Sequence, residues 1–250
     1  SVRLVPIVQL PAMPSTEALH ISVISLGGER LTAANQTLTA LGFQVDRVEP
    51  PAIDSDAVQK EMSRARPDEP DARMAASLML AHANLWDCHS GWRVIVEDDV
   101  APTAAPLLAT EVRSLLRHVA KHAKHAPMVM LGRIEEAIHV RRPDSGRRSL
   151  SFCPSSERCV ELESCASLGL HAYAVRCRLT RGLFRRARAS LPHMLLRYPS
   201  HARFNADVLL RDHFTRERHG ARWPLCVAPV AFRQDTERFP SMLNHSRKSF

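Results

Sequence analysis

The stretch Trp92-Arg93-Val94-Ile95-Val96-Glu97-Asp98-Asp99-Val100 decides the fold of this chain. An apolar, β-branched run leads straight into three consecutive carboxylates, and Pro102 follows. Because turn signals bound this run, it predicts a buried β-strand. Acids at the carboxyl end of such a strand lie where open α/β sheets usually bind their ligands.

The three acids Glu97, Asp98 and Asp99 repel one another, so something must offset their charge. A divalent cation such as Mn²⁺ or Mg²⁺ is the simplest candidate, because these ions take oxygen ligands and share them with phosphates. The alternative is an ordinary acidic strand exit with solvated carboxylates. The local pattern alone leaves both interpretations open.

The segment before this strand predicts a β-α-β unit. Residues 20–26 form an apolar strand that ends at Gly27-Gly28, a helix with leucines on one face ends at Gly42, and residues 43–48 alternate as a second strand. This order favours a parallel sheet. A Gly-Gly turn before a helix can bind phosphate through backbone N–H groups, although no Gly-x-Gly-x-x-Gly fingerprint is present.

Further elements follow along the chain. We expect helices at residues 74–86, 104–124 and 179–191, strands at residues 128–132, 169–175 and 225–232, and another helix opening near Asp207. Residues 50–72 and 141–167 predict long loops, and residues 192–203 a shorter one. The histidines at positions 118, 122 and 125 share one face of the expected helix, where a solvated basic face is favoured over a zinc site.

Composition narrows the class of protein. The 250 residues are 45% hydrophobic and 24% charged, as in a soluble globular chain, and no apolar run is long enough to predict a transmembrane segment. The net charge of +8 is uneven, with −6 in residues 1–100 and +14 in residues 101–250. Such asymmetry can mark a nucleic-acid or membrane surface, or an anionic substrate. The basic residues are scattered and aromatic residues make up only 5% of the chain, which weakens an interpretation by base stacking.

The six cysteines contain no Cys-x-x-Cys pair, which argues against a structural zinc site. Cys153, Cys159 and Cys165 lie close together in the sequence. They could form a disulfide in an oxidising lumen, such as the endoplasmic reticulum or Golgi, or stay free in a cytoplasmic or membrane-peripheral protein. The compartment is therefore left open.

Ordered motifs over residues 20–242 resemble glycosyltransferase family 25, the lipooligosaccharide and collagen-type sugar transferases. The most specific is Val96-Glu97-Asp98-Asp99-Val100, which matches the family's L-E-D-D-V core. The family's G-C-A-L-S-H…W helix is similar to Ser77-Leu78-Met79-Leu80-Ala81-His82 with Leu85-Trp86. Its H-A-Y-L-I-S strand is similar to His171-Ala172-Tyr173-Ala174-Val175.

Shorter segments also follow the family order. They are Val23-Ile24-Ser25-Leu26 with Arg30, Leu41-Gly42-Phe43, Arg47-Val48, residues 129–132, Asp207, and Pro229 with Gln234. The chain departs from the family pattern at Gly27-Gly28, Ser77, Ala81 and Ala206.

The resemblance implies a single-domain α/β fold with a GT-A-like nucleotide-binding sheet flanked by helices. The domain would cover residues 20–242, after a lead-in at 1–19 and before a polar tail at 243–250. The implied reaction is the inverting transfer of a hexose, galactose or glucose, from a UDP-sugar to a hydroxyl of a glycan or protein. Mn²⁺ or Mg²⁺ would assist it, and nucleic acid is not an expected partner.

The resemblance also implies roles for individual residues. Asp99 and Asp98 would hold the metal, and Asp207 would be the general base, unless it is only a helix-start carboxylate. His82 is either near the donor or a satisfied core histidine, and His171 is either a metal or phosphate contact or simply packed. The donor contacts would come from Ser25, Leu26, Arg30, His82, Glu97 and Asp98.

Two other functions stay open. A catalytically inactive module could keep this fold and bind an anionic partner through its basic half. A metal-dependent phosphodiesterase or nuclease could use the same acidic triplet, but the sequence contains no recognisable nuclease motif.

Overall fold

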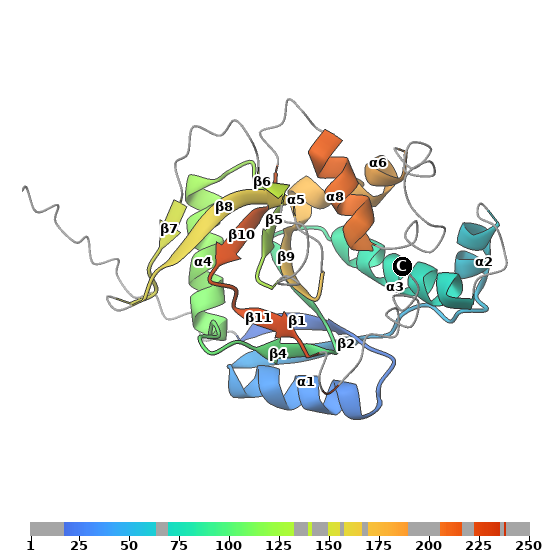
Figure 1. Ribbon diagram of the computed structural model, residues 1–250, viewed down its shortest axis with the longest axis horizontal. Coiled ribbons are helices and arrows are strands. Elements are labelled where there is room, and N and C mark those ends of the chain that lie inside the picture. The colour runs from blue at the N-terminus through green and yellow to red at the C-terminus, as the bar shows by residue number, and fades with distance from the viewer. Residues whose placement is uncertain are drawn as a thin grey trace, which may run out of the picture.

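The computed structural model describes residues 18–63, 70–132, 140–141, 150–155, 158–166, 170–189, 206–216, 223–235 and 238. The expectations for residues 1–17, 192–203 and 243–250 concern positions outside these ranges. The described residues form one α/β unit in which helices cover both faces of a large mixed sheet (Figure 1). The predicted α/β class is thus confirmed.

The predicted β-α-β opening is also confirmed. β1 (Leu19–Ile24), α1 (Gly28–Ala40) and β2 (Phe43–Val48) follow one another, and β1 pairs in parallel with β2. On its other side β1 pairs in parallel with β3 (Trp92–Glu97), with Ile24 opposite Glu97. β2 and β3 therefore lie on opposite sides of β1, so the strand order changes direction there. Such a switch point, between β1 and β3, opens a crevice at the carboxyl ends of the strands.

The main sheet holds nine described strands in the order β2-β1-β3-β9-β5-β10-β8-β6, with β7 paired to β8. The bounds of its later strands are β5 (Met128–Met130), β6 (Val140–Arg141), β7 (Leu150–Phe152), β8 (Val160–Ala166), β9 (Ala172–Arg176) and β10 (Leu225–Ala228). β9 runs antiparallel to both β3 and β5. A separate two-stranded ribbon pairs β4 (Val100–Pro102) with β11 (Phe232–Gln234), next to the acidic turn.

Two hydrophobic clusters flank the sheet. One contains Val94 and Val96 of β3 with residues of α1 and α4 (Ala109–His122). The other contains Ile95 with residues of α2, α3, α6 and α8. Alternate side chains of a strand point to opposite faces, which explains this division. The helices of the second face are α2 (Asp56–Met62), α3 (Pro70–Trp86), α6 (Leu183–Ala189) and α8 (Ala206–Arg216).

The prediction of a loop over residues 50–72 is wrong. α2 forms there because the Ser55 side chain accepts a hydrogen bond from the Val58 N–H at 3.5 Å and caps the helix. Val58 and Met62 are buried and pack within the same cluster as α3. α3 itself begins at Pro70, because proline is well suited to a first helical turn.

The prediction of a loop over residues 141–167 is also wrong, since β6, β7 and β8 lie there. In β8, Val160 and Leu162 are buried while Glu161 and Glu163 are more exposed, so the segment alternates with a period of two. β8 pairs antiparallel with β10 and β7. The helix predicted over residues 179–191 is likewise divided, into α5 (Cys177–Thr180) and α6.

Two other elements are shorter than predicted. α4 ends at His122, so His125 lies outside the helix that was expected to carry it. The strand predicted over residues 225–232 stops at Ala228, because Pro229 has no N–H to continue the ladder, and the chain resumes as β11. None of the described helices combines the length and apolar character needed to cross a membrane.

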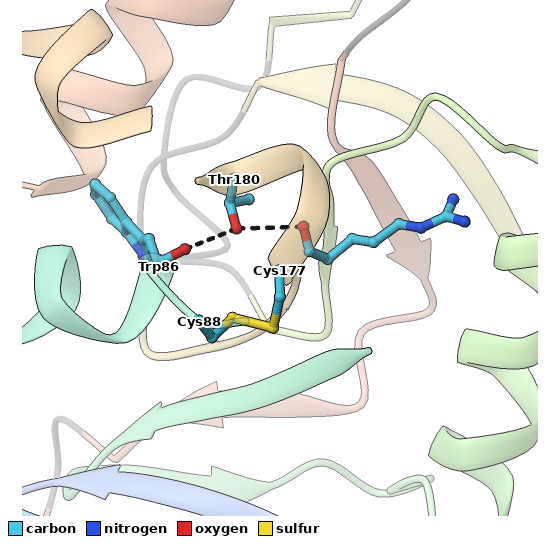
Figure 2. Close-up of a disulfide and its surroundings, with 5 residues drawn as sticks. Trp86, Cys88, Cys177 and Thr180 are labelled. Carbon is cyan, nitrogen blue, oxygen red and sulfur yellow. Dashed lines mark hydrogen bonds between the residues drawn. A yellow bond between two sulfur atoms is a disulfide. The ribbon is translucent and has the colours of Figure 1, made fainter. Parts of the chain in front are cut away.

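All six cysteines are paired, as Cys88–Cys177, Cys153–Cys159 and Cys165–Cys226. Figure 2 shows the first pair, which joins the segment after α3 to the start of α5. Beside it the Thr180 hydroxyl donates to the Trp86 carbonyl at 2.9 Å. The end of α3 is therefore fastened to the end of β9. Three disulfides are typical of proteins from an oxidising compartment.

Candidate functional site

The acidic triplet lies at the carboxyl end of β3. Glu97 is the last residue of β3, and Asp98 and Asp99 form the turn before β4. The segment that follows β1 lies beside this turn, at the switch point of the sheet. Each of the three carboxylates has a different set of partners.

Asp98 is held by two residues from the segment after β1. The Ser25 hydroxyl donates to Asp98 Oδ2 at 2.6 Å, and Arg30 Nη1 lies 3.8 Å from Asp98 Oδ1. The same hydroxyl oxygen accepts the Gly27 N–H at 2.9 Å. Burial raises the pKa of Asp98, although Ser25 and Arg30 oppose that rise. Two predicted donor contacts, Ser25 and Arg30, thus bind and orient Asp98.

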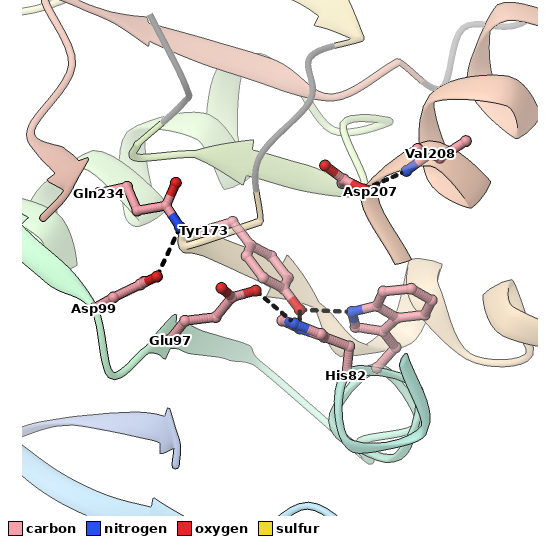
Figure 3. A network of polar contacts seen from close by, with 8 residues as sticks. His82, Glu97, Asp99, Tyr173, Asp207, Val208 and Gln234 are labelled. Carbon is pink, nitrogen blue, oxygen red and sulfur yellow. Dashed lines mark hydrogen bonds and ion pairs between the residues drawn. The ribbon is translucent and has the colours of Figure 1, made fainter. Parts of the chain in front are cut away.

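Asp99 is the most buried of the three, with 4% of its surface exposed. Its Oδ2 accepts a hydrogen bond from Gln234 Nε2 at 2.7 Å, because the β4–β11 ribbon brings Gln234 alongside (Figure 3). Its Oδ1 is buried and has no hydrogen-bond partner among the described residues. Burial, together with the charges of Glu97 and Asp98, raises the pKa of Asp99 to about 7. This oxygen needs a proton or a cation.

Glu97 ends a buried chain of hydrogen bonds (Figure 3). Trp86 Nε1 donates to Tyr173 Oη at 2.9 Å. Tyr173 Oη lies 2.7 Å from His82 Nδ1, and His82 Nε2 lies 3.0 Å from Glu97 Oε1. An ionised carboxylate only accepts, so we assign the His82 proton to Nε2 and let the Tyr173 hydroxyl donate to Nδ1. Each hydrogen bond in this chain then has one defined donor and one defined acceptor.

The same contacts set the ionisation of the network. Burial opposes the charged form of Glu97, but the hydrogen bond from His82, together with the electrostatic effects of His82, His171 and Arg30, outweighs it and lowers the pKa of Glu97. Burial raises the pKa of Tyr173 well above its usual range, so the hydroxyl stays protonated. His82 is only 1% exposed, which matches the core-histidine interpretation. His82 and Tyr173 therefore position Glu97 from beneath the site.

His171 precedes β9 and lies next to Glu97, whose backbone N–H donates to the His171 carbonyl at 3.0 Å. Its ring is 2% exposed, and neither ring nitrogen has a partner among the described residues. A Cβ added to Gly132 would lie 2.9 Å from His171 Nε2, so only glycine leaves room for this ring. Burial lowers the pKa of His171 to about 4, against the effect of Glu97, and the ring is neutral at pH 7.

The remaining predicted residues lie around this edge. Leu26 follows β1, and its side chain is 59% exposed. Asp207 lies in the first turn of α8, half-buried, and its Oδ1 accepts the Val208 N–H at 2.7 Å. In the view of Figure 3, Tyr173 lies between Asp99 and Asp207. The structure thus brings the triplet, Ser25, Arg30 and His82 into one connected group, with Asp207 on a separate helix.

The side chains of this site can be tested for their fit to a bound metal ion. No three His, Cys, Asp or Glu side chains in the described part of the chain are arranged to hold an ion by themselves. Mg²⁺ and Mn²⁺, however, are often bound by one or two carboxylates, with substrate phosphates completing the shell. The unpaired Oδ1 of Asp99, next to Asp98, fits a site of that kind.

Tyr173 and Gln234 are the residues whose roles the sequence analysis missed. A signal for Tyr173 was available, because positions 171 and 173 of one strand share a face. Gln234 lies 135 positions from Asp99 in the sequence, and only the β4–β11 pairing brings them together.

Comparison of the chain with protein-family models found no match, and comparison with curated proteins found none either. The fold and the site define an α/β protein with a buried acidic group at the switch point of its sheet. Its function is therefore inferred from the geometry of that group.

Proposed function

We propose that this protein is a metal-assisted glycosyltransferase with a GT-A-like sheet, which moves a hexose from a UDP-sugar to a hydroxyl of a glycan or protein. One observation carries the proposal: the buried Asp99 Oδ1 at the β1–β3 switch point has no partner among the described residues and lies beside two more carboxylates. A diphosphate is itself anionic, so it could approach these carboxylates only if a cation lay between the diphosphate and the carboxylates. A cation-bridged diphosphate would thus account for both the position and the charge.

The chain's own residues would divide the work at this edge. Asp99 would hold the cation, with Gln234 fixing one carboxylate oxygen and leaving the other to bind. Asp98 would assist, in the orientation that Ser25 and Arg30 give it. When bound, Mn²⁺ or Mg²⁺ would act as a Lewis acid that neutralises the departing diphosphate.

The turn after β1 would take the nucleotide. Gly27 and Gly28 adopt φ angles of 101° and 74°, and nothing lies within 4 Å of a Cβ added to Gly28, so a phosphate can approach the backbone. The turn leads directly into α1, whose first N–H groups favour an anion. Leu26 would offer its exposed side chain to the nucleoside.

We assign the general-base role to Asp207. The amino-terminal turn of α8 and the Val208 N–H both favour an ionised carboxylate, which is the form that takes a proton from the attacking hydroxyl. Asp207→Asn should abolish transfer and preserve Mn²⁺-dependent UDP binding. A loss of UDP binding in this variant would instead place Asp207 in the donor site.

A donor screen tests the proposal. The disulfide-bonded protein is incubated with Mn²⁺ and single UDP-sugars, and released UDP is measured, because donor hydrolysis needs no acceptor. We expect turnover with one UDP-sugar that disappears in EDTA and in Asp99→Asn. Asp87→Asn, which removes an exposed carboxylate with the same change of charge, should keep it. No turnover and no Mn²⁺-dependent UDP binding would refute the enzyme and leave an inactive binding module.

A further inference from the structure

A second charged site lies at the opposite end of β9 from the acidic edge. β9 starts at Ala172, beside Val96, and ends at Arg176, beside Trp92. Past that end the surface is hollowed into a pocket of about 430 Å³. The described residues that line it are Lys124, Arg176, Arg178, Leu179, Arg181 and Arg186. Five of these six described residues are cationic and none of them is acidic.

Backbone carbonyls hold two of these arginines in place. Arg176 Nη1 donates to the Lys124 carbonyl at 2.8 Å, and its guanidinium lies 5.8 Å from the centroid of the Trp92 ring. Arg186 Nη1 donates to the Arg181 carbonyl at 2.9 Å. The Lys124 carbonyl after α4 and the Arg181 carbonyl between α5 and α6 therefore orient the guanidinium groups of Arg176 and Arg186. A fixed donor loses less conformational entropy when it binds a ligand.

The charge of this pocket is not neutralised within the described residues. None of its five cations forms an ion pair with a described carboxylate. A guanidinium has five N–H donors, so Arg176 and Arg186 each keep at least three that no described residue accepts. Arg178, Arg181 and Lys124 are exposed at the rim. A concave surface with one sign of charge concentrates anions of opposite sign.

We propose that this pocket binds a compact anion that carries phosphate or sulfate groups. Guanidinium groups match such oxyanions through paired, charge-assisted hydrogen bonds. The volume lies within the range of small-ligand sites, roughly 300–1,000 Å³. Along β9 the pocket is about 16 Å from the acidic edge, at roughly 3.3 Å per residue. The proposal does not depend on the enzymatic function.

Larger anionic partners are less well matched. No aromatic side chain among the described residues lines the pocket to stack on a base, and Trp92 is in contact with Arg176. The large exposed apolar side chains of the described chain, Leu26, Ile53 and Leu108, do not line it either. A membrane-binding surface would combine its cations with such side chains.

Calorimetric titration in EDTA tests the proposal with two probes, inorganic tripolyphosphate and a fully sulfated disaccharide. We expect at least one to bind, and the comparison tells phosphate from sulfate. Arg178→Ala/Arg181→Ala should weaken binding about tenfold or more, since each removes a charge-assisted contact. The matched control is Arg73→Ala/Arg117→Ala, which removes two exposed arginines elsewhere and should change the affinity less than twofold. Asp99→Asn should bind as the wild type does.

Four results would overturn the proposal. The first is the failure of both probes to bind the wild type. The second is an equal loss of affinity in the control variant, because the effect would then depend only on the net charge of the protein. The third is a loss of binding in Asp99→Asn, which would move the anion to the acidic edge. The fourth is binding of a single-stranded oligonucleotide or of phosphatidylserine vesicles that depends on Arg178 and Arg181 when neither small probe binds.

Discussion

The two ends of β9 carry opposite charges in opposite surroundings. At the His171 end the charged and polar groups are buried or half-buried, and most are hydrogen-bonded to one another; burial raises the pKa of Asp99 and lowers that of His171, which favours the neutral form of each. At the Arg176 end most of the cations are exposed, and backbone carbonyls bind two of them, Arg176 and Arg186. Substitutions of the buried groups should therefore change folding and protonation, whereas those of the exposed cations should change only ligand affinity.

The largest effect should come from the disulfide at the Arg176 end, because it fastens β9 to α3. Cys88 and Cys177 are 89 positions apart, so Cys88→Ser/Cys177→Ser should lower the free energy of unfolding by about 4.6 kcal/mol on the loop-entropy estimate. Cys153 and Cys159, 6 positions apart, give a control pair whose loss should cost about 2 kcal/mol. Guanidinium unfolding followed by tryptophan fluorescence measures both, and equal losses would contradict this account.

The next effect tests the buried network. Tyr173→Phe leaves the Trp86 N–H and His82 Nδ1 without their partner, so we expect a loss of about 2–4 kcal/mol. Ser114→Ala removes an exposed hydroxyl that bonds the Thr110 carbonyl and should change stability little. Guanidinium unfolding followed by tryptophan fluorescence measures the stability of both variants. If Tyr173→Phe were as stable as Ser114→Ala, the network would not support the site.

These expectations rest on contacts that the sequence reveals only in part. The β-α-β opening and the acidic strand were predictable because their signals are local: a period of two over residues 43–48, and an apolar run ending in acids. The Val-Glu-Leu-Glu alternation of β8 was an equally local signal that the analysis overlooked. The Pro- and Asp-rich composition of residues 50–72 hid the Ser55 cap of α2.

The site was predictable in its residue types but not in its pairings. The sequence shows that three acidic residues are adjacent, but it does not show that Ser25 binds Asp98 or that His82 binds Glu97. Those pairings depend on which strands are neighbours and on which face each side chain lies. The unpaired oxygen of Asp99 is likewise a property of packing between distant segments.

An effect in the opposite direction should follow from Asp99→Asn. Its folded pKa of about 7 lies above the value of about 4 in an unfolded chain, so between these pH values the native state keeps a proton that the unfolded state loses. Stability therefore falls as pH rises through this window. Asparagine removes that cost and can still accept from Gln234, so the variant should gain up to about 4 kcal/mol at pH 8 and nothing at pH 4.

Thermal unfolding in EDTA between pH 4 and pH 8 measures this difference. Asp87→Asn, at an exposed carboxylate, is the matched control and should follow the wild type at every pH. Parallel curves for Asp99→Asn and the wild type would show that Asp99 does not destabilise the native state.

The smallest effect on stability is expected at the basic pocket. Arg178→Ala/Arg181→Ala should leave the melting temperature unchanged without a ligand, because both side chains are exposed. The probe that binds, tripolyphosphate or the sulfated disaccharide, should raise the melting temperature of the wild type more than that of the variant. A destabilisation as large as that of Tyr173→Phe would remove the contrast between the two ends of β9.

The most direct test of the central claim, a cation-dependent diphosphate site at the acidic edge, is calorimetric titration of UDP with and without Mn²⁺. We predict binding by the wild type and by Asp87→Asn in Mn²⁺, and none in EDTA or in Asp99→Asn. UDP binding that is indifferent to Mn²⁺ and to Asp99, or no UDP binding at all, would contradict the claim.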